Sequence, residues 1–259
     1  MAPSPLYVYA VVNAGLALPR GLRGVGRPPA PVRLLPAGEL AAVVSDAPPD
    51  LRARRRDLTA HQDLLLALCE GGPVLPMRFG MTADDAGTVR RAVDAAAPVH
   101  LAALRRLGRR IEMNLKAMPA QDAVQALVRE DAAVRRLAAF VRRQPSYEGN
   151  VRLGSAIAEG LDRRAAQAAD GVARELAALA DECVRGTEVP GCVLNTSFLL
   201  PRAHVERCRE LVESRAAELR DRLELRLTGP LPCYSFVPRE SDPARSRAAG
   251  SPRRAAVSN

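Results

Sequence analysis

Two segments of the chain alternate apolar and polar residues, which is the pattern of a strand with one buried face. They are RRIEMNLKA (residues 109–117) and DRLELRLTG (residues 221–229). Each follows an apolar run and an amphipathic stretch, with VLPMRFG (residues 74–80) before the first and VLNTSFLL (residues 193–200) before the second. Because a helix between two strands usually folds back over the sheet that holds both, we expect two strand-helix-strand units and two α+β lobes.

Three further patterns extend the N-terminal half. LYVYAVV (residues 6–12) has the composition of a strand, and the apolar runs between residues 32 and 46 indicate a hairpin. A helix is expected from about Leu51 to Glu70, where a pair of glycines ends it.

A helical hairpin is expected between the two units. Apolar residues recur at heptad spacing from Ile157 to Cys183, a second helical run covers residues 121–143, and a polar loop (residues 144–150) joins them. At 1.5 Å per residue the longer helix reaches ~40 Å, and a seam packed within the chain is favoured over one offered to a partner. The expected division is an N-terminal lobe (1–118), a C-terminal lobe (119–238) with a helical hairpin (121–185) and a strand-helix-strand unit (193–228), and a tail (239–259).

The positive charge does not by itself indicate nucleic-acid binding. The chain has 259 residues and a net charge of +9, and all of its basic residues except Lys116 are arginine. The arginines lie among acidic residues on helical stretches, and no basic run is interleaved with aromatic residues that would stack on bases. Residues 239–259 carry part of the excess charge and lack an apolar period, so we expect them to be disordered.

Little in the sequence points to a metal, a cofactor or catalysis. The five cysteines include no C-x-x-C pair, so we expect free cytosolic thiols. His204 and Cys208 are spaced like metal ligands on a helix, but they form an isolated pair. The glycines between residues 21 and 26 precede prolines where a phosphate-binding loop needs a helix. From these missing motifs we expect no cofactor. The apolar N-terminal run is too short to span a bilayer, so we also expect a cytoplasmic protein.

His61 and an acidic pair are the candidate catalytic groups. His61 is either a general base or partner contact, or a helix residue that anchors a neighbouring loop by a hydrogen bond. The second role is favoured, because no Ser or Cys nucleophile with an orienting carboxylate can be placed against it. Asp84 and Asp85 are expected at the start of a helix, where negative charge is favourable.

Several segments follow one another in a distinctive order and spacing over about residues 6–237. They are LYVYAVV, the L-A-A-V-V-S strand, the R-x-x-L-x-x-H helix (Arg55, Leu58, His61), VLPMRFGM, R-R-I-E-M-N-L-K, Y-E-G-N (Tyr147 to Asn150), VLNTSFLLP and TGPLPCYSFV. In this order they resemble the gas vesicle protein GvpL/GvpF family. The last segment departs from the family pattern, because Leu231 and Cys233 stand where members commonly have a tryptophan and a proline.

The resemblance implies a ferredoxin-like N-terminal lobe and a second lobe with a long antiparallel helical pair. It also implies a non-enzymatic role in gas vesicle formation, as an accessory or minor structural protein in the cytoplasm or the gas vesicle. The implied partners are the hydrophobic shell protein GvpA and other accessory gas vesicle proteins, without a specific nucleic acid or a membrane.

We expect the partner-binding surface at Arg78, Phe79 and Gly80. In VLPMRFG, Phe79 should face the core while Arg78 points outward at a sheet edge. There a shell-protein strand could add by main-chain hydrogen bonds, and Gly80 permits a close turn. The alternative function is a ferredoxin-like nucleic-acid or nucleotide-binding protein, which requires Tyr7 and Tyr9 to be exposed beside Arg78.

Overall fold

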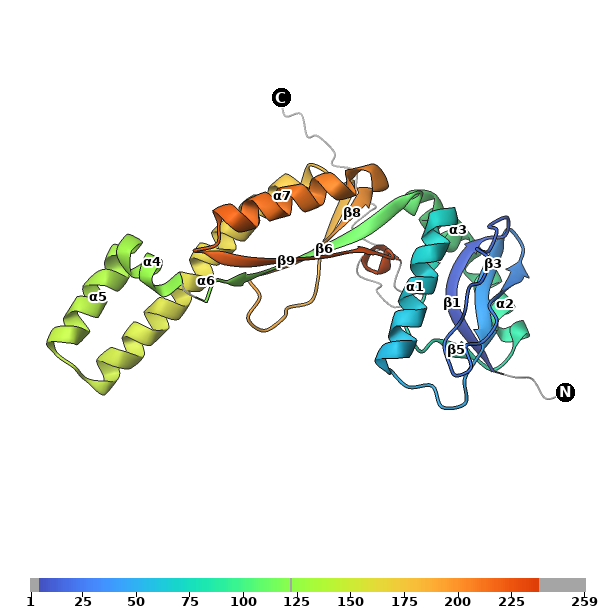
Figure 1. Ribbon diagram of the computed structural model, residues 1–259, viewed down its shortest axis with the longest axis horizontal. Coiled ribbons are helices and arrows are strands. Elements are labelled where there is room, and N and C mark those ends of the chain that lie inside the picture. Colours follow the sequence, from blue (N-terminus) through green and yellow to red (C-terminus); the bar gives the residue numbers. More distant parts are fainter. Residues whose placement is uncertain (1–4, 122, 238–259) are drawn as a thin grey trace, which may run out of the picture.

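The molecule consists of two sheets in a row and a helical hairpin at the end away from the N-terminal sheet (Figure 1). The structure, a computed structural model, describes residues 5–121 and 123–237. The predicted tail, residues 239–259, lies outside the described residues. Antiparallel sheets with helices packed on their faces confirm the expected α+β class.

The N-terminal sheet contains β1 (Leu6–Asn13), β2 (Arg33–Ala37), β3 (Leu40–Asp46), β4 (Val74–Pro76) and β5 (Thr82–Ala83). Their order is β2-β3-β1-β4, and β5 also pairs with β1. β2 and β3 form the predicted hairpin. A ferredoxin-like β-α-β-β-α-β lobe has a helix between its first two strands, whereas an irregular loop connects β1 to β2 here.

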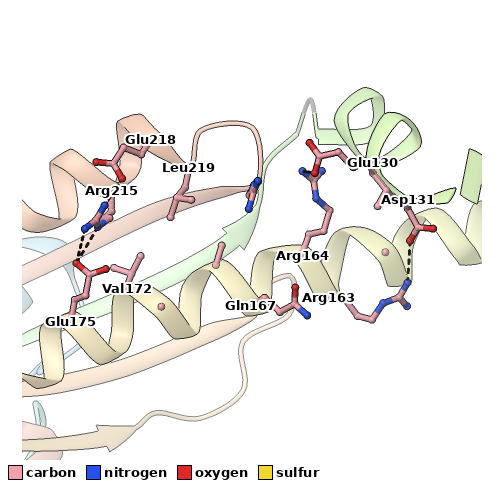
Figure 2. A pocket seen from close by; sticks show the side chains of 15 residues that line it. Glu130, Asp131, Arg163, Arg164, Gln167, Val172, Glu175, Arg215, Glu218 and Leu219 are labelled. Carbon is pink, nitrogen blue, oxygen red and sulfur yellow. Dashed lines mark hydrogen bonds and ion pairs between the residues drawn. The ribbon is translucent and has the colours of Figure 1, made fainter. Parts of the chain in front are cut away.

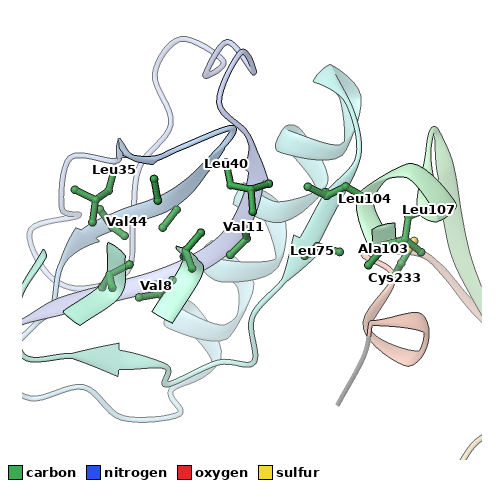
Figure 3. Packing of buried hydrophobic residues seen from close by; sticks show 14 of the residues in the cluster. Val8, Val11, Leu35, Leu40, Val44, Leu75, Ala103, Leu104, Leu107 and Cys233 are labelled. Carbon is green, nitrogen blue, oxygen red and sulfur yellow. The ribbon is translucent and has the colours of Figure 1, made fainter. Parts of the chain in front are cut away.

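Helices cover both faces of this sheet, which explains why β1 is apolar along almost its whole length. α1 (Arg55–Gly71) packs on the face that carries Tyr7. α2 (Ala86–Ala95) and α3 (Ala97–Leu107) pack on the face that carries Val8 (Figure 3). α1 begins about one turn later than the sequence pattern predicts.

The strand formed by residues 109–117 belongs to the second sheet and not to the first. There β6 (Arg110–Pro119) lies between β8 (Leu194–Pro201) and β9 (Leu223–Leu231), antiparallel to both, and β7 (Glu182–Arg185) completes the order β7-β8-β6-β9. The expectation that VLPMRFG and this strand share one sheet in the N-terminal lobe is therefore wrong. Alternation identifies a strand with one buried face, but it does not identify the sheet that the strand joins.

The second predicted strand-helix-strand unit is present. α7 (Val205–Glu218) connects β8 to β9 after a 3₁₀ turn (Arg202–His204). Since β8 and β9 both run antiparallel to β6, they are parallel to each other with β6 inserted between them. This is a split β-α-β arrangement.

α6 (Tyr147–Ala177) extends from the second sheet into the hairpin. Its C-terminal half covers the same sheet face as α7, and its side chains Ala165, Val172 and Leu176 are buried in that core. The favoured seam within the chain is thus confirmed for this half. Cys183, the last predicted member of the seam, lies in β7 instead, because the helix ends before it.

α4 (Ala123–Glu130) and α5 (Ala132–Arg143) form the other side of the hairpin (Figure 1). The single helix expected over residues 121–143 is interrupted at Asp131, whose carboxylate accepts hydrogen bonds from two N–H groups of α5 at 2.8 and 3.1 Å. The connection to α6 is shorter than expected, because Ser146 caps α6 and places Y-E-G-N in its first turn.

The last described residues, 232–237, return toward the N-terminal sheet. Cys233 and Phe236 join the core cluster formed with α3, and Figure 3 shows Cys233 beside Leu107. Ser235 donates from its N–H and Oγ to the buried Glu112 carboxylate at 2.9 and 2.7 Å. This segment therefore links both sheets.

Candidate partner-binding site

The three residues predicted to bind a partner lie together in a loop that leaves the edge of the N-terminal sheet. Residues 77–80 are not a continuation of β4, which corrects the expectation of a strand through Gly80. Met77 N–H donates to the Tyr9 carbonyl at 2.8 Å and Val8 N–H donates to the Met81 carbonyl at 2.9 Å. We call residues 77–81 the edge loop. Both of its ends are fixed to β1.

Within the edge loop the side chains have different environments. Arg78 is exposed, Phe79 is half-buried and packs on the core cluster around Tyr7, and Met81 is 44% exposed. Gly80 has a φ of 91°, a conformation that residues with a Cβ rarely adopt. The expectation that Phe79 faces inward and Arg78 outward is therefore confirmed.

A buried hydrogen-bond network lies beneath the edge loop. The Tyr7 hydroxyl accepts from Gly80 N–H at 3.1 Å and lies 2.9 Å from His61 Nδ1. His61 Nε2 lies 3.1 Å from the Met77 carbonyl and 3.1 Å from the Tyr234 hydroxyl. His61 thus anchors a neighbouring loop by hydrogen bonds, which confirms the role favoured for it.

The hydrogen bonds of this network fit a neutral histidine with its proton on Nε2. The Met77 carbonyl can only accept, so His61 Nε2 carries a proton, and Nδ1 then accepts from the Tyr7 hydroxyl. Burial lowers the pKa of His61 below its ordinary value of 6.5, opposed by the hydrogen bond to Met77. Burial also raises the pKa of Tyr7 to about 12.

Aromatic packing completes this network. The ring of His61 stacks on Tyr9 with centroids 5.7 Å apart, and Phe79 meets Tyr7 and His61 edge-on at 6.0 and 5.7 Å. Tyr7 and Tyr9 are both 0% exposed, so neither presents a ring for stacking on a base. The exposed tyrosines required for nucleic-acid binding are thus absent from β1.

The loop between β1 and β2 is held from the same side. Val25 N–H donates to the Tyr9 hydroxyl at 2.8 Å, and Gly26 N–H donates to the buried Asp57 carboxylate at 3.1 Å. Burial alone would raise the pKa of Asp57, but the hydrogen bonds from Gly26 and Arg56 outweigh it and keep that pKa below 3.8.

A charged groove lies between α4, α6 and α7 (Figure 2), with a volume of about 610 Å³. Arg215 donates to Glu175 at 3.0 and 3.1 Å, and Arg164 donates to Glu130 at 2.7 Å while its Nη1 is buried without a described hydrogen-bond partner. Four arginines and four carboxylates line it: Arg163, Arg164, Arg215, Arg222, Glu130, Asp131, Glu175 and Glu218. The groove is therefore neutral overall, and its ion pairs hold α6 against its neighbours.

The cysteines, His204 and Asp85 all have environments typical of residues that stabilise the fold. All five cysteines are free, and burial raises the pKa of Cys69 and Cys208 to about 11. His204 lies 2.9 Å from the Leu179 carbonyl through Nδ1, and no group of three or more metal-ligating side chains occurs in residues 5–121 and 123–237. Asp85 caps α2 by accepting from Thr88 N–H at 2.7 Å, as expected for the acidic pair.

Sequence reasoning missed the residues that complete the network. Tyr234 lies 173 positions from His61 in the chain, and no spacing pattern connects them. The pairing of Ser235 with Glu112 was missed for the same reason. The only signal in the sequence was the P-C-Y-S-F segment near the end of the chain.

Comparison with known proteins gives a consistent result along the chain. A profile of the gas vesicle synthesis protein GvpL/GvpF family matches residues 5–238. Gas vesicle protein F of Streptomyces sp. (strain CB03234) is 37% identical over 235 residues, which cover 89% of this chain and 98% of that protein.

Two crystal structures share the fold. GvpF from Anabaena sp. PCC7120 has a TM-score of 0.77 at 21% identity and covers 92% of this chain and 100% of its own. GvpF from Microcystis aeruginosa has a TM-score of 0.71 at 20% identity, with 91% and 99% covered.

The fold and the sequence together define a gas vesicle protein. The chain belongs to the gas vesicle synthesis protein GvpL/GvpF family. Among its described helices, none is long and apolar enough to cross a membrane.

Proposed function

We propose that this chain is an accessory or minor structural protein of gas vesicle formation that binds the hydrophobic shell protein GvpA and assists wall assembly. It acts without catalysis, moves from the cytoplasm to the growing gas vesicle, and contacts other accessory gas vesicle proteins. Membership of the family supports the gas vesicle part of the proposal. The geometry of the edge loop supports the binding part.

The binding proposal rests on the side chains that the edge loop exposes. It presents a cation at Arg78 beside the partly exposed apolar side chains of Phe79 and Met81. An apolar shell subunit with a carboxylate near its contact surface would satisfy both features, because arginine binds carboxylates in a planar fork. The network of Tyr7 and His61 holds the loop in one conformation, which reduces the entropy lost on binding.

The structure changes the expected mode of contact. β4 has only three residues and ends at Pro76, which has no N–H to donate. Short edge strands with proline resist pairing with an incoming strand. We therefore propose contact through the side chains of the edge loop in place of strand addition.

Binding of purified shell protein to two charge-reversal variants tests this proposal. Arg78→Glu should weaken binding about tenfold or more, since a favourable charge pair becomes a repulsive one. The matched control Arg220→Glu makes the same change at an exposed position after α7 and should leave binding unchanged. Equal affinity of Arg78→Glu and the parent, with both proteins folded, would remove the edge loop from the binding surface.

Half-buried Phe79 allows a separate test of how the edge loop is packed. Phe79→Ala should lower the free energy of unfolding by about 1–3 kcal/mol, less than the 3–5 kcal/mol typical of a fully buried phenylalanine. Urea denaturation measures this loss. A loss below about 0.5 kcal/mol would show that Phe79 contributes little to the packing around Tyr7.

A further inference from the structure

The end of the helical hairpin presents apolar side chains to solvent. We call residues 136–152 the hairpin tip. In it Phe140 is 53% exposed, Tyr147 is 87% exposed and Val151 is 50% exposed. Tyr147 and Val151 are four residues apart in the first turns of α6 and so share a helix face. Phe140 lies in the last turn of α5, on the other side of the same short connection.

The hairpin tip is also strongly positive. It contains Arg136, Arg142, Arg143 and Arg152 against the single acidic residue Glu148, and all five are exposed. None of these arginines forms an ion pair with a described residue, and the ion pairs of α6 begin further along, at Glu159 and Arg163. The groove between α6 and α7 differs in this respect, since its arginines are matched by carboxylates.

The hairpin tip is held in a defined conformation by a helix cap and by close contact between its two helices. Ser146 caps α6 by accepting from Gly149 N–H at 3.0 Å, and Val141 is buried beneath it. A Cβ on Gly149 would lie 3.3 Å from Val141 Cγ2, so the two helices are in close contact at this point. The exposed aromatic side chains therefore project from two helices that pack closely against each other.

We propose that the hairpin tip docks an acidic surface of a partner protein. Tyr147, Phe140 and Val151 enter an apolar centre of that surface, and the arginines pair with carboxylates around it. Tyrosine and arginine, together with tryptophan, are enriched among the residues that contribute most to binding at protein interfaces. This proposal goes beyond the shell-protein contact, because the edge loop belongs to the N-terminal sheet at the opposite end of the molecule (Figure 1).

Charge and the arrangement of the apolar side chains favour an acidic protein surface over two other occupants. A second copy of the chain docked tip to tip would bring like charges together, which is unfavourable. A helix that binds a membrane surface lies flat on a continuous apolar face, whereas the apolar side chains here are confined to the end of a hairpin whose helices carry charges of both signs.

Crosslinking at the tip identifies the partner. The full chain, with benzoylphenylalanine in place of Tyr147, is irradiated in cells that form gas vesicles. The same group at Val99, which is 53% exposed on α3, serves as control. A protein captured from position 147 and not from position 99 is purified for the titration that decides the proposal. Capture of no protein, or equal capture from both positions, overturns it.

Charge reversal in the purified pair gives the decisive result. R142E/R143E should weaken binding at least about tenfold and R142K/R143K should change it less than about threefold, with the helix content of both variants unchanged. Unchanged affinity of R142E/R143E overturns the proposal, as does binding of vesicles of phosphatidylserine and phosphatidylcholine more tightly than the captured protein. Arg78→Glu should keep the tip contact, so failure here is distinguishable from failure of the edge loop.

Discussion

At the residue scale, one proton position determines how the edge loop is held. Neutral His61 accepts from Tyr7 and donates toward the Met77 carbonyl, and a second proton on Nδ1 would remove that acceptor. Because the pKa of His61 in the folded state lies below 6.5, the unfolded state takes up a proton first as the pH falls. The stability that His61 contributes is therefore complete above about pH 6.5 and is lost as the pH falls through the lower folded value.

The variant His61→Gln tests this account. The free energy of unfolding of the parent should fall between about pH 7 and pH 5, and that fall should be smaller in the variant, which cannot titrate there. At about pH 7.5 the variant should be less stable by about 1–3 kcal/mol, since buried hydrogen bonds are lost. Urea denaturation at both ends of this pH range measures the slope. Equal slopes in the two proteins would refute the linkage.

Gly24 makes a second prediction at this scale. A Cβ at this position would lie 2.3 Å from the Tyr9 hydroxyl and 3.1 Å from the Ala30 carbonyl oxygen. Gly24→Ala should therefore displace the loop that Tyr9 holds and cost about 1–3 kcal/mol of stability. Gly15→Ala, which meets nothing within 4 Å, is the matched control and should be nearly neutral. A neutral Gly24→Ala would show that this loop is not held as described.

At the element scale, the glycines of α6 distinguish packed from open parts of the helix. A Cβ on Gly154 would meet nothing within 4 Å, whereas a Cβ on Gly160 would lie 2.9 Å from Leu127 Cδ2 on α4. Gly154→Ala should raise the free energy of unfolding by up to about 1 kcal/mol through helix propensity. The free energy of unfolding of Gly160→Ala should be lower than that of Gly154→Ala by about 1 kcal/mol or more, because buried Leu127 must move. Equal thermal midpoints of the two variants would contradict close packing of α4 on α6.

Element types were more predictable than their partners. Local periodicity, which the sequence displays directly, predicts three features: the hairpin of β2 and β3, the alternation of β6 and β9, and the seam of α6. The sheet that β6 joins does not follow from local periodicity, because it depends on pairing with β8 and β9 far along the chain. The break at Asp131 does not follow from it either, because the cap interrupts an otherwise continuous helical pattern. Arg78 faces outward and Phe79 inward as predicted, although they lie in a loop and not in the alternating strand that was expected. The network through Tyr234 depends on a tertiary contact between residues far apart in the chain.

At the scale of the whole molecule, the elongated arrangement separates two surfaces. The edge loop belongs to the N-terminal sheet, and the hairpin tip lies at the other end of the row of elements (Figure 1). The two proposed contact surfaces, one at each end of the molecule, would allow it to bring two assembly components together.

The most direct test of the central claim is the gas vesicle content of cells that lack this chain. Deletion in a strain that forms gas vesicles, followed by electron microscopy and flotation of cell extracts, measures that content. Vesicles should be absent or strongly reduced after deletion and should return when the parent chain is supplied. Normal number and shape of vesicles in the deletion strain would contradict a role in their formation.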